Sequence, residues 1–502
     1  MITNVLEYLE KSATEFPNKV GYCDENESLT FDEMKLRSQA IGTKVSEYIG
    51  KGNPVAVYME KSVAAISAFF GVAYAGAFYV PLDVDMPNQR VQLILETLET
   101  ELVIVDQNNA DKIKMLNYSG KVIQYEELVS TKINMEKIQK IRRMMIDSDP
   151  LYAIFTSGST GVPKGVVTSQ RSAVNFTEWY CNAFEFTDKE IFGNQTPFYF
   201  DASVKDIYAT LRCAATMYII PKKLFSFPVQ LIEYLNKYKI NCIDWVPSAL
   251  CLIVNFKTFE KIKPLYLKKV MFLGEVMPTK QFNMWRRALP DIKYANLYGP
   301  TEATGDCTYY KVERELADNE PIPIGYACEN SEVLILNEKN ELVQTGEIGE
   351  ICVRGVSLAL GYFNNQEKTD SVFVENPLQK HYRELIYRTG DLGKYNEYGE
   401  IIYAARKDFQ IKHMGHRIEL GEIEVALTAV PEVHQACCLY DTNKNKIVAI
   451  YSGDITREKI INQIKQAVPK YMIPNIFHQV EILPINMNGK IDRVKLKEDY
   501  IS

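Results

Sequence analysis

The stretch Thr156-Ser-Gly-Ser-Thr-Gly-Val-Pro-Lys164-Gly165 constrains this chain more than any other. The apolar run 151–155 precedes it and predicts a buried strand, while Val166-Val167 predicts a second strand before a helix from about Ser172. A loop rich in glycine and hydroxyl side chains therefore lies between two strands. Glycine lets backbone N–H groups approach a ligand, hydroxyls add further donors, and lysine adds a positive charge. Together these groups are suited to holding a polyphosphate.

This stretch differs from the usual P-loop, which needs Gly-Lys-Ser/Thr at the start of a helix. Here Pro163 precedes Lys164 and Gly165 follows it. A plain flexible turn is the alternative, and the flanking strands weigh against it. The stretch closely resembles the phosphate loop of the adenylate-forming superfamily, which comprises amino-acid adenylation domains, acyl-CoA synthetases and luciferases. The resemblance implies that the phosphates of ATP bind to Thr156, Ser157, Gly158, Ser159, Thr160, Gly161 and Lys164.

Composition narrows the class of protein. A chain of 502 residues predicts two or more domains, and its net charge of -7 argues against a nucleic-acid partner. Ten scattered cysteines and five histidines show no metal-binding spacing, so we expect reduced thiols in a cytoplasmic protein without a secretion leader. Residues 63–80 are almost uncharged, but Gly71 and Gly76 favour a buried helix over 62–74 and a strand over 77–80 rather than a membrane span.

Strands alternating with helices predict an α/β fold with a largely parallel sheet covered on both faces. Three apolar strands within 240–244, 269–273 and 294–298 each end in a polar turn, and such turns should converge on a ligand. Glycine and glutamate turns across 346–362 predict a β-rich subdomain. We expect a large N-terminal domain of α/β subdomains plus this β-rich subdomain over 1–407, and a small mobile α+β C-terminal domain over 408–502. The resemblance implies a hinge at Asp408.

Further motifs match the superfamily in order. The element Tyr298-Gly-Pro-Thr-Glu302 implies that Tyr298 packs on adenine, Thr301 contacts the α-phosphate and Glu302 holds Mg²⁺, a role that suits a carboxylate beside phosphate oxygens. A β-turn at Gly299-Pro300 is the alternative. Asp391 resembles the ribose-binding aspartate, with a plain hairpin turn as the alternative. The resemblance also implies a catalytic Lys490 that stabilises the transition state, and further nucleotide contacts from Gly274, Glu275, Asn296 and Arg406.

Asp201 follows an aromatic segment, where an unpaired carboxylate is costly. It is either the N-cap of the next helix or, as the resemblance to amino-acid-activating enzymes implies, the partner of the substrate's α-ammonium. Lys205 pairs either with a substrate carboxylate or only with Asp244 or Asp306. The pattern resembles glutamate-activating domains, so we expect a polar or acidic amino acid, glutamate first and a cationic one second. The predicted pocket residues are Asp201, Ala202, Lys205, Asp244, Met271, Leu273, Leu297, Gly305 and Asp306.

The resemblance implies an ATP- and Mg²⁺-dependent enzyme with two half-reactions. An amino acid is first activated as aminoacyl-AMP with release of pyrophosphate, and a thiol then takes the aminoacyl group. Rotation about Asp408 removes Lys490 and brings in the loop around Gly415. We expect the thiol to be the phosphopantetheine of a separate carrier protein. Coenzyme A is an alternative acceptor that Asp201 disfavours. For the enzyme as a whole, a D-alanine–carrier protein ligase is an alternative. A catalytically dead scaffold is disfavoured because Lys490, Asp391 and Glu302 are present. How His413 and Met414 line a pantetheine tunnel is left open.

Overall fold

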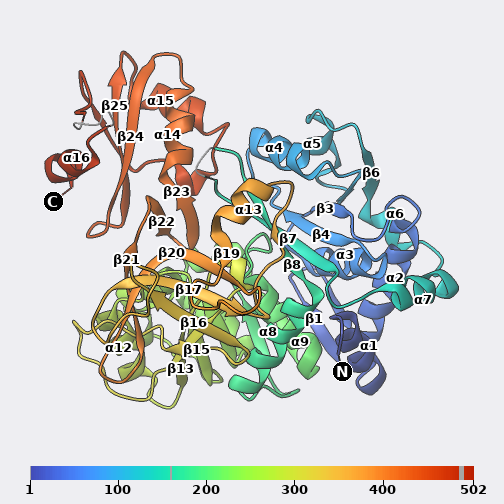
Figure 1. Cartoon of the computed structure of the whole chain (residues 1–502). Helices are drawn as coiled ribbons and strands as arrows, with labels where there is room; N and C mark the ends of the chain where they lie inside the picture. The colour runs from blue at the N-terminus through green and yellow to red at the C-terminus, as the bar shows by residue number, and fades with distance from the viewer. Residues whose placement is uncertain (1, 159–160, 486–490, 502) are drawn as a thin grey trace.

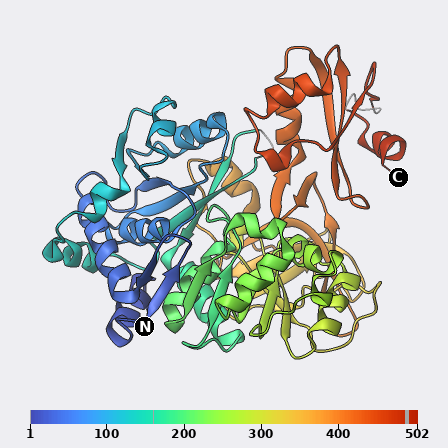
Figure 2. The ribbon, with the colours of Figure 1, turned by 180° about the vertical axis from the view of Figure 1, so that it is seen from behind.

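The computed structural model describes residues 2–158, 161–485 and 491–501. Figure 1 shows a large N-terminal domain, and a smaller C-terminal domain, drawn in orange and red, that lies against one side of it. Figure 2 shows the same arrangement from behind, with the C-terminal domain again reached through the strands that follow β21 (Ile401–Arg406). The predicted α/β architecture is confirmed.

The phosphate-loop stretch joins two strands of one sheet. This sheet runs in the order β18-β8-β7-β4-β3-β5-β6, with β7 and β8 antiparallel and the strands from β7 through β4, β3 and β5 to β6 parallel. Pairing of β18 with β8 ties the loop to the following β-rich region. The bounds are β3 (Pro54–Tyr58), β4 (Phe78–Leu82), β5 (Leu102–Val105), β6 (Lys121–Gln124), β7 (Pro150–Thr156), β8 (Lys164–Ser169) and β18 (Gly361–Tyr362).

A second sheet carries the three strands that were predicted to end in polar turns. Its order is β15-β14-β13-β12-β11-β9-β10-β1-β2, and β11, β12 and β13 are parallel neighbours, so their carboxyl ends share one edge. The bounds are β1 (Val20–Cys23), β2 (Ser28–Thr30), β9 (Ile191–Asn194), β10 (Thr216–Ile219), β11 (Cys242–Trp245), β12 (Lys269–Phe272), β13 (Lys293–Tyr298), β14 (Thr308–Lys311) and β15 (Tyr326–Ala327).

Helices cover these two sheets. At the start of α2, the Thr30 hydroxyl accepts a hydrogen bond from the Glu33 N–H, and the Glu33 carboxylate accepts one from the Thr30 N–H. This capping box satisfies N–H groups that would otherwise be unpaired. The almost uncharged segment forms α3, which is capped by Ser62 and buried in the core. The bounds are α1 (Leu6–Glu15), α2 (Phe31–Val45), α3 (Val63–Tyr74), α4 (Asn88–Leu98), α5 (Ala110–Lys114), α6 (Tyr125–Val129), α7 (Met135–Met144), α8 (Gln170–Ala183), α9 (Ser203–Cys213), α10 (Pro228–Lys237), α11 (Pro247–Asn255) and α12 (Thr279–Ala288).

Membrane insertion receives no support from these helices. In the part of the chain that the structure describes, none combines the length and the apolar character needed to cross a bilayer.

The β-rich subdomain is an antiparallel sheet in the order β16-β17-β20-β19, with β21 paired to β20. Asp391 lies inside β20 and opposite Arg406 of β21, so the alternative of a hairpin turn at Gly390-Asp391 is wrong. The bounds are β16 (Ser331–Leu336), β17 (Gly349–Gly355), β19 (Phe373–Glu375), β20 (Leu385–Tyr395) and α13 (Gln366–Val372).

The C-terminal domain has its own apolar core, which includes Ile423 and Leu427 of α14 and Ile447 of β25. Its sheet runs β24-β25-β26, and the β22–β23 hairpin extends toward the N-terminal domain (Figure 1). The bounds are β22 (Gln410–His413), β23 (His416–Glu419), α14 (Leu420–Thr428), β24 (Val433–Asp441), β25 (Lys446–Gly453), α15 (Arg457–Ile464), β26 (Ile476–Gln479) and α16 (Arg493–Tyr500). The proposed hinge, Asp408, falls between β21 and β22.

Candidate functional site

Three described features of the stretch between β7 and β8 suit a bound anion. A Cβ added at Gly158 would lie 2.1 Å from the Val162 carbonyl oxygen, so the backbone closes this tightly only with glycine. Gly161 has a φ of +82°, which also favours glycine. The Thr156 hydroxyl is buried and has no hydrogen-bond partner among the described residues. These features fit a bound polyphosphate, which would accept from such donors; Ser159 and Thr160 lie outside the described residues.

Glu302 is fully buried in the turn after β13 and faces two cationic side chains. The Tyr362 hydroxyl donates to its Oε1 at 2.6 Å, and the Arg417 guanidinium lies 2.7 Å from Oε2. Although burial opposes ionisation, the charges of Arg417 and Lys164 lower the pKa of Glu302 to about 2. Among the described residues, no group of three or more His, Cys, Asp or Glu forms a ready metal site. A Mg²⁺ ion bound here would take Glu302 and phosphate oxygens as ligands, a common ligand set for this ion.

The structure brings three predicted nucleotide-binding residues together. The Tyr298 hydroxyl donates to Asp391 Oδ2 at 2.6 Å, and Arg406 contacts Asp391 Oδ1 at 2.9 Å. Arg406 also forms a two-point ion pair with Asp408, the proposed hinge residue, at 2.6 and 2.7 Å. Asn296 is placed differently, because its amide donates to the Pro323 carbonyl and helps to fix the end of β13.

One cavity of about 1090 Å³ connects these parts. The N-terminal domain contributes part of the phosphate loop and some of the predicted amino-acid and nucleotide contacts, whereas Lys164, Tyr298 and Glu302 do not line the cavity. The C-terminal domain closes the cavity with the β22–β23 hairpin. Lining residues include Thr156, Ser157, Asp201, Ala202, Leu273, Gly274, Thr301, Gly305, Asp391, Arg406, Lys412, Gly415, His416 and Arg417. The candidate site is therefore shared by the two domains.

Asp201 lies in the wall of this cavity. The alternative that it caps a helix is wrong, since α9 has Ala202 at its N-cap and lacks a side-chain cap bond. Burial raises the pKa of Asp201, and the neighbouring Thr301 hydroxyl and Lys205 oppose that shift. A half-buried carboxylate at the edge of a cavity is suited to an ammonium group, which would compensate its charge.

Lys205 forms a buried ion triad with Asp244 and Asp306. Its ammonium lies 2.7 Å from Asp244 and 3.2 Å from Asp306, and none of the three side chains is more than 1% exposed. Lys205 therefore pairs with both of these aspartates. The triad carries one excess negative charge, and one oxygen of each aspartate has no partner among the described residues.

The predicted pocket residues fall into two groups. The cavity wall is formed by Asp201, Ala202, Leu273 and Gly305. The ion triad and the core side chains Met271 and Leu297 do not line the cavity and lie behind its wall.

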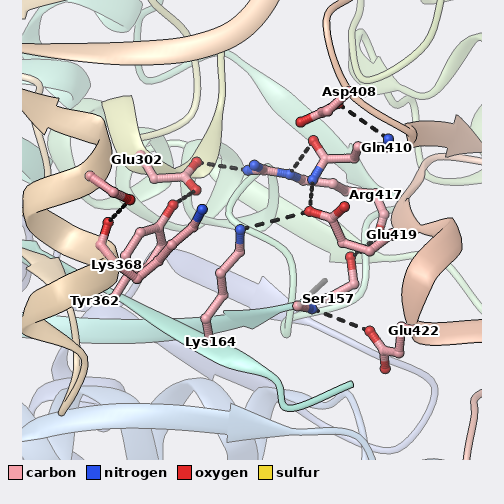
Figure 3. Close-up of polar contacts among 12 residues, drawn as sticks. Ser157, Lys164, Glu302, Tyr362, Lys368, Asp408, Gln410, Arg417, Glu419 and Glu422 are labelled. Atoms are coloured by element: carbon pink, nitrogen blue, oxygen red, sulfur yellow. Dashed lines mark hydrogen bonds and ion pairs between the residues drawn. The ribbon is translucent and has the colours of Figure 1, made fainter. Parts of the chain in front are cut away.

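Sequence reasoning missed the contacts that the C-terminal domain makes with the phosphate loop (Figure 3). Glu422 of α14 accepts from the Gly158 N–H at 3.3 Å and pairs with Arg90 of α4. Glu419 lies 3.9 Å from the Lys164 ammonium, and its own N–H donates to Ser157 Oγ at 3.2 Å. The sequence signal for these contacts was the density of charged residues in 417–422.

A second contact between the domains involves the loop around Gly415, called here the glycine loop. Glu275 accepts from the Ser248 N–H at 2.9 Å and from the Gly415 N–H at 2.8 Å, so it joins the two domains. His416 stacks on Tyr471 with ring centroids 3.5 Å apart, and burial lowers the pKa of His416 to about 3, which keeps it neutral. His416 and Met414 line the cavity, whereas His413 is buried against Tyr440.

Comparison with known proteins agrees with this site. The family model described as AMP-binding enzyme matches residues 9–363, and the AMP-binding enzyme C-terminal domain matches residues 422–490. A D-alanine–D-alanyl carrier protein ligase from Bacillus cytotoxicus is 32% identical over 98% of both chains. Tyrocidine synthase 1 from Brevibacillus parabrevis is 30% identical over 99% of this chain, which spans only 45% of that protein.

Solved structures show the same fold. That of IdnL1 has a TM-score of 0.84 at 22% identity and covers 96% of this chain and 99% of its own. An artificially fused adenylation–PCP di-domain from Klebsiella oxytoca has a TM-score of 0.82 at 20% identity, over 95% of this chain and 94% of its own. With both family models matched in order along the sequence, the chain belongs to the AMP-binding enzyme family.

Proposed function

We propose that this protein uses ATP and Mg²⁺ to activate an amino acid as aminoacyl-AMP and then transfers the aminoacyl group to the phosphopantetheine thiol of a separate carrier protein. The observation that carries the proposal is the position of Asp201, which lines the same cavity as Thr156 and Ser157 of the phosphate loop and Thr301. An ammonium held by Asp201 would leave the substrate carboxylate to face the α-phosphate. The likeness to a D-alanine–D-alanyl carrier protein ligase supports both an amino acid as the substrate and a carrier protein as the acceptor.

In this proposal the residues of the chain position reactants and compensate charge. Asp201 fixes the ammonium, Lys164 and the loop N–H groups hold phosphates, and Glu302 holds Mg²⁺, which neutralises phosphate charge. Asp391 accepts from the ribose hydroxyls, with Arg406 and Tyr298 fixing its two oxygens. Attack of the carboxylate on the α-phosphorus then forms the acyl–phosphate bond and releases pyrophosphate. Positioning of this kind, together with charge stabilisation, accounts for most phosphoryl-transfer catalysis.

The proposal is tested by amino-acid-dependent ATP–pyrophosphate exchange over the twenty amino acids, D-alanine and several aryl and fatty acids. We expect exchange only with acids that carry an α-amine. Asp201→Ala should lower kcat/KM for the preferred amino acid by about 10²-fold or more, because the substrate ammonium loses the carboxylate proposed to pair with it. Asp188→Ala, at an exposed surface pair, is the control. Exchange with an acid that lacks an amine would contradict the assignment of Asp201.

Two substrate side chains have support. A glutamate substrate is supported by the resemblance of Ala202, Lys205, Asp244 and Asp306 to the pattern of glutamate-activating domains. To bind glutamate, Lys205 would have to exchange its ion pair with one aspartate for an ion pair with the substrate's side-chain carboxylate. A small neutral side chain, as in D-alanine, is favoured by the cavity wall at Ala202, Leu273 and Gly305, behind which the triad is already paired. A glutamate signal in the exchange panel would support the first, and a D-alanine signal the second.

The glycine loop provides a separate test of the transfer step. A Cβ added at Gly415, whose φ is +78°, would lie 2.7 Å from Val246 Cγ1 of the N-terminal domain. Gly415→Ala should therefore slow thioester formation by about tenfold or more, the equivalent of roughly 1.4 kcal/mol, and leave pyrophosphate exchange within about twofold. Gly399→Ala is matched, because its φ is +73° and no atom lies within 4 Å of the added Cβ. Equal losses in both half-reactions of the Gly415 variant would show that the contact does not belong to transfer.

A further inference from the structure

A lysine-rich surface lies at the edge of the second sheet that is remote from the cavity. Strands β11, β12 and β13 are parallel, so their carboxyl ends reach the cavity and their amino ends lie at the opposite edge. From Lys269, where β12 begins, to Leu273 in the cavity wall the chain rises by roughly 13 Å. Six exposed lysines, called here the lysine face, belong to the segments at this amino edge: Lys237, Lys239, Lys257, Lys261, Lys263 and Lys268.

Side-chain contacts hold these segments together. The Asn236 amide at the end of α10 donates to the Lys263 carbonyl at 3.0 Å and accepts from the Leu265 N–H at 2.7 Å. The Lys239 ammonium lies 5.9 Å from the centre of the Tyr266 ring. The end of α10 and the loop before β12 therefore share one surface.

Positive charge on this face lacks compensation by neighbouring carboxylates. At the same edge, Lys269 pairs with Glu190 and Lys293 pairs with Glu185, whereas in the described part of the chain none of the six lysines forms an ion pair. Residues 256–268 contain four lysines and one glutamate, in a chain whose net charge is -7. The face is thus a local concentration of positive charge on an acidic protein.

Large apolar side chains are exposed among these lysines. Leu265 is 75% exposed, Phe256 67% and Tyr266 41%. Compensation of helix ends explains part of the charge, since the Lys263 ammonium donates to the Ala288 carbonyl at the end of α12 at 3.0 Å. It does not explain why apolar side chains stand in water beside the lysines, a combination that marks an interaction surface.

We propose that the lysine face, together with Phe256, Leu265 and Tyr266, docks this protein on an anionic lipid surface. Lysines at the level of the headgroups are attracted by the negative surface potential, and the apolar side chains between them enter the boundary with the acyl chains. The contact is peripheral and needs no helix that crosses the bilayer.

Two features favour a lipid surface over a nucleic acid as the occupant. The segments that form the face, 236–241 and 255–268, contain lysines and no arginine, whose planar fork is the better match for single phosphates. The exposed leucine also gains nothing from a phosphate backbone, whereas an acyl boundary removes it from water. Docking at the amino edge leaves the cavity, at the carboxyl edge, open to its reactants.

The proposal is tested by co-sedimentation of the full-length protein with lipid vesicles. One set contains phosphatidylcholine and phosphatidylglycerol in a ratio of about two to one, and the other contains phosphatidylcholine alone. We expect binding to the anionic vesicles to be roughly tenfold tighter or more at about 0.1 M salt, and to weaken as the salt concentration rises. Failure to bind the anionic vesicles, or equal binding to both sets, would overturn the proposal.

A charge-reversed variant tests the lysines. Lys261→Glu/Lys268→Glu should weaken binding to the anionic vesicles by about 25-fold or more, since each lysine near such a surface contributes roughly fivefold. Lys380→Glu/Lys459→Glu is the matched control, because both lysines are exposed, lie in the β-rich subdomain and the C-terminal domain, and form no ion pair with the described residues. Equal losses in the two variants would show that net charge, and not this face, drives binding.

A second variant tests the apolar side chains. Phe256→Ser/Leu265→Ser should weaken binding by about tenfold or more and leave its salt dependence unchanged, because apolar area no longer enters the bilayer. Met115→Ser/Leu342→Ser changes side chains that are 74% and 52% exposed elsewhere and should bind as the unmodified protein does. Unchanged binding by the Phe256→Ser/Leu265→Ser variant would contradict the proposal.

Urea unfolding of every variant should keep the midpoint of the unmodified protein, so that a loss of binding is separated from a loss of fold. Duplex RNA serves as the competing probe. Binding of this RNA that disappears in Lys261→Glu/Lys268→Glu, without binding of vesicles by the unmodified protein, would overturn the proposal and assign the lysine face to a nucleic acid.

Discussion

Replacement of Lys490 by alanine is expected to slow amino-acid-dependent ATP–pyrophosphate exchange by about 10²- to 10³-fold, the usual cost of losing one group that stabilises a transition state. Thioester formation from supplied aminoacyl-AMP should stay within about threefold of the unmodified rate. The reason is that, in the proposed function, the two half-reactions use different faces of the C-terminal domain. Lys490 lies outside the described residues, so its role rests on the sequence motif.

The structure supplies the contrast for this prediction. The face that meets the site presents Gly415 and Arg417, whereas Leu483 and Ile491, on either side of the lysine, pack with Leu496 in the domain's own second core cluster. Lys495→Ala, at an exposed position of α16, is the control and should leave both rates unchanged. Equal loss of both half-reactions in the Lys490 variant would show that one domain arrangement serves both steps.

Lys205→Met is expected to lower the free energy of unfolding of the N-terminal domain by about 3–5 kcal/mol, because it leaves two aspartates buried without a cation. Urea unfolding followed by tryptophan fluorescence measures this directly. The chain has three tryptophans, and Trp179, Trp245 and Trp285 all lie in that domain.

Two companion variants decide the cause of that loss. Lys293→Met removes an exposed partner of Glu185, whose side chains are 74% and 75% exposed, and should cost less than about 1 kcal/mol. Adding Asp244→Asn and Asp306→Asn to Lys205→Met should recover most of the stability, since no net charge then remains buried. Similar losses for Lys205→Met and the triple variant would assign the effect to packing and not to charge.

Much of the site could be predicted from short stretches of sequence, because each stretch builds its own geometry. The phosphate loop is a hairpin whose glycines are required by local backbone closure, and Asp391 sits in a strand opposite Arg406. The predicted start of the helix after the phosphate loop was two residues late. α8 begins at Gln170 and not at Ser172, because the Ser169 side chain accepts from the Ser172 N–H and caps the helix earlier.

The contacts between the domains could not be predicted, since they join residues far apart in the chain. Gly158 and Glu422 are separated by 264 positions, and Ser157 and Arg417 by 260. In the neighbouring sequence, no feature distinguishes Glu419 or Glu422 from solvent-exposed charged residues at the start of a helix. Similarly, the pairing of Lys205 with both aspartates depends on how α9, β11 and the turn after β13 pack, so the sequence left two arrangements open.

The ion triad has a consequence for how this protein can change over evolutionary time. Because each member is buried and compensates the others, a mutation at any one of Lys205, Asp244 or Asp306 leaves a charge without its partner. A lineage therefore passes through a destabilised ancestor unless the positions change together. The triad should behave as a single inherited character, which is kept or exchanged as a set when substrate preference diverges.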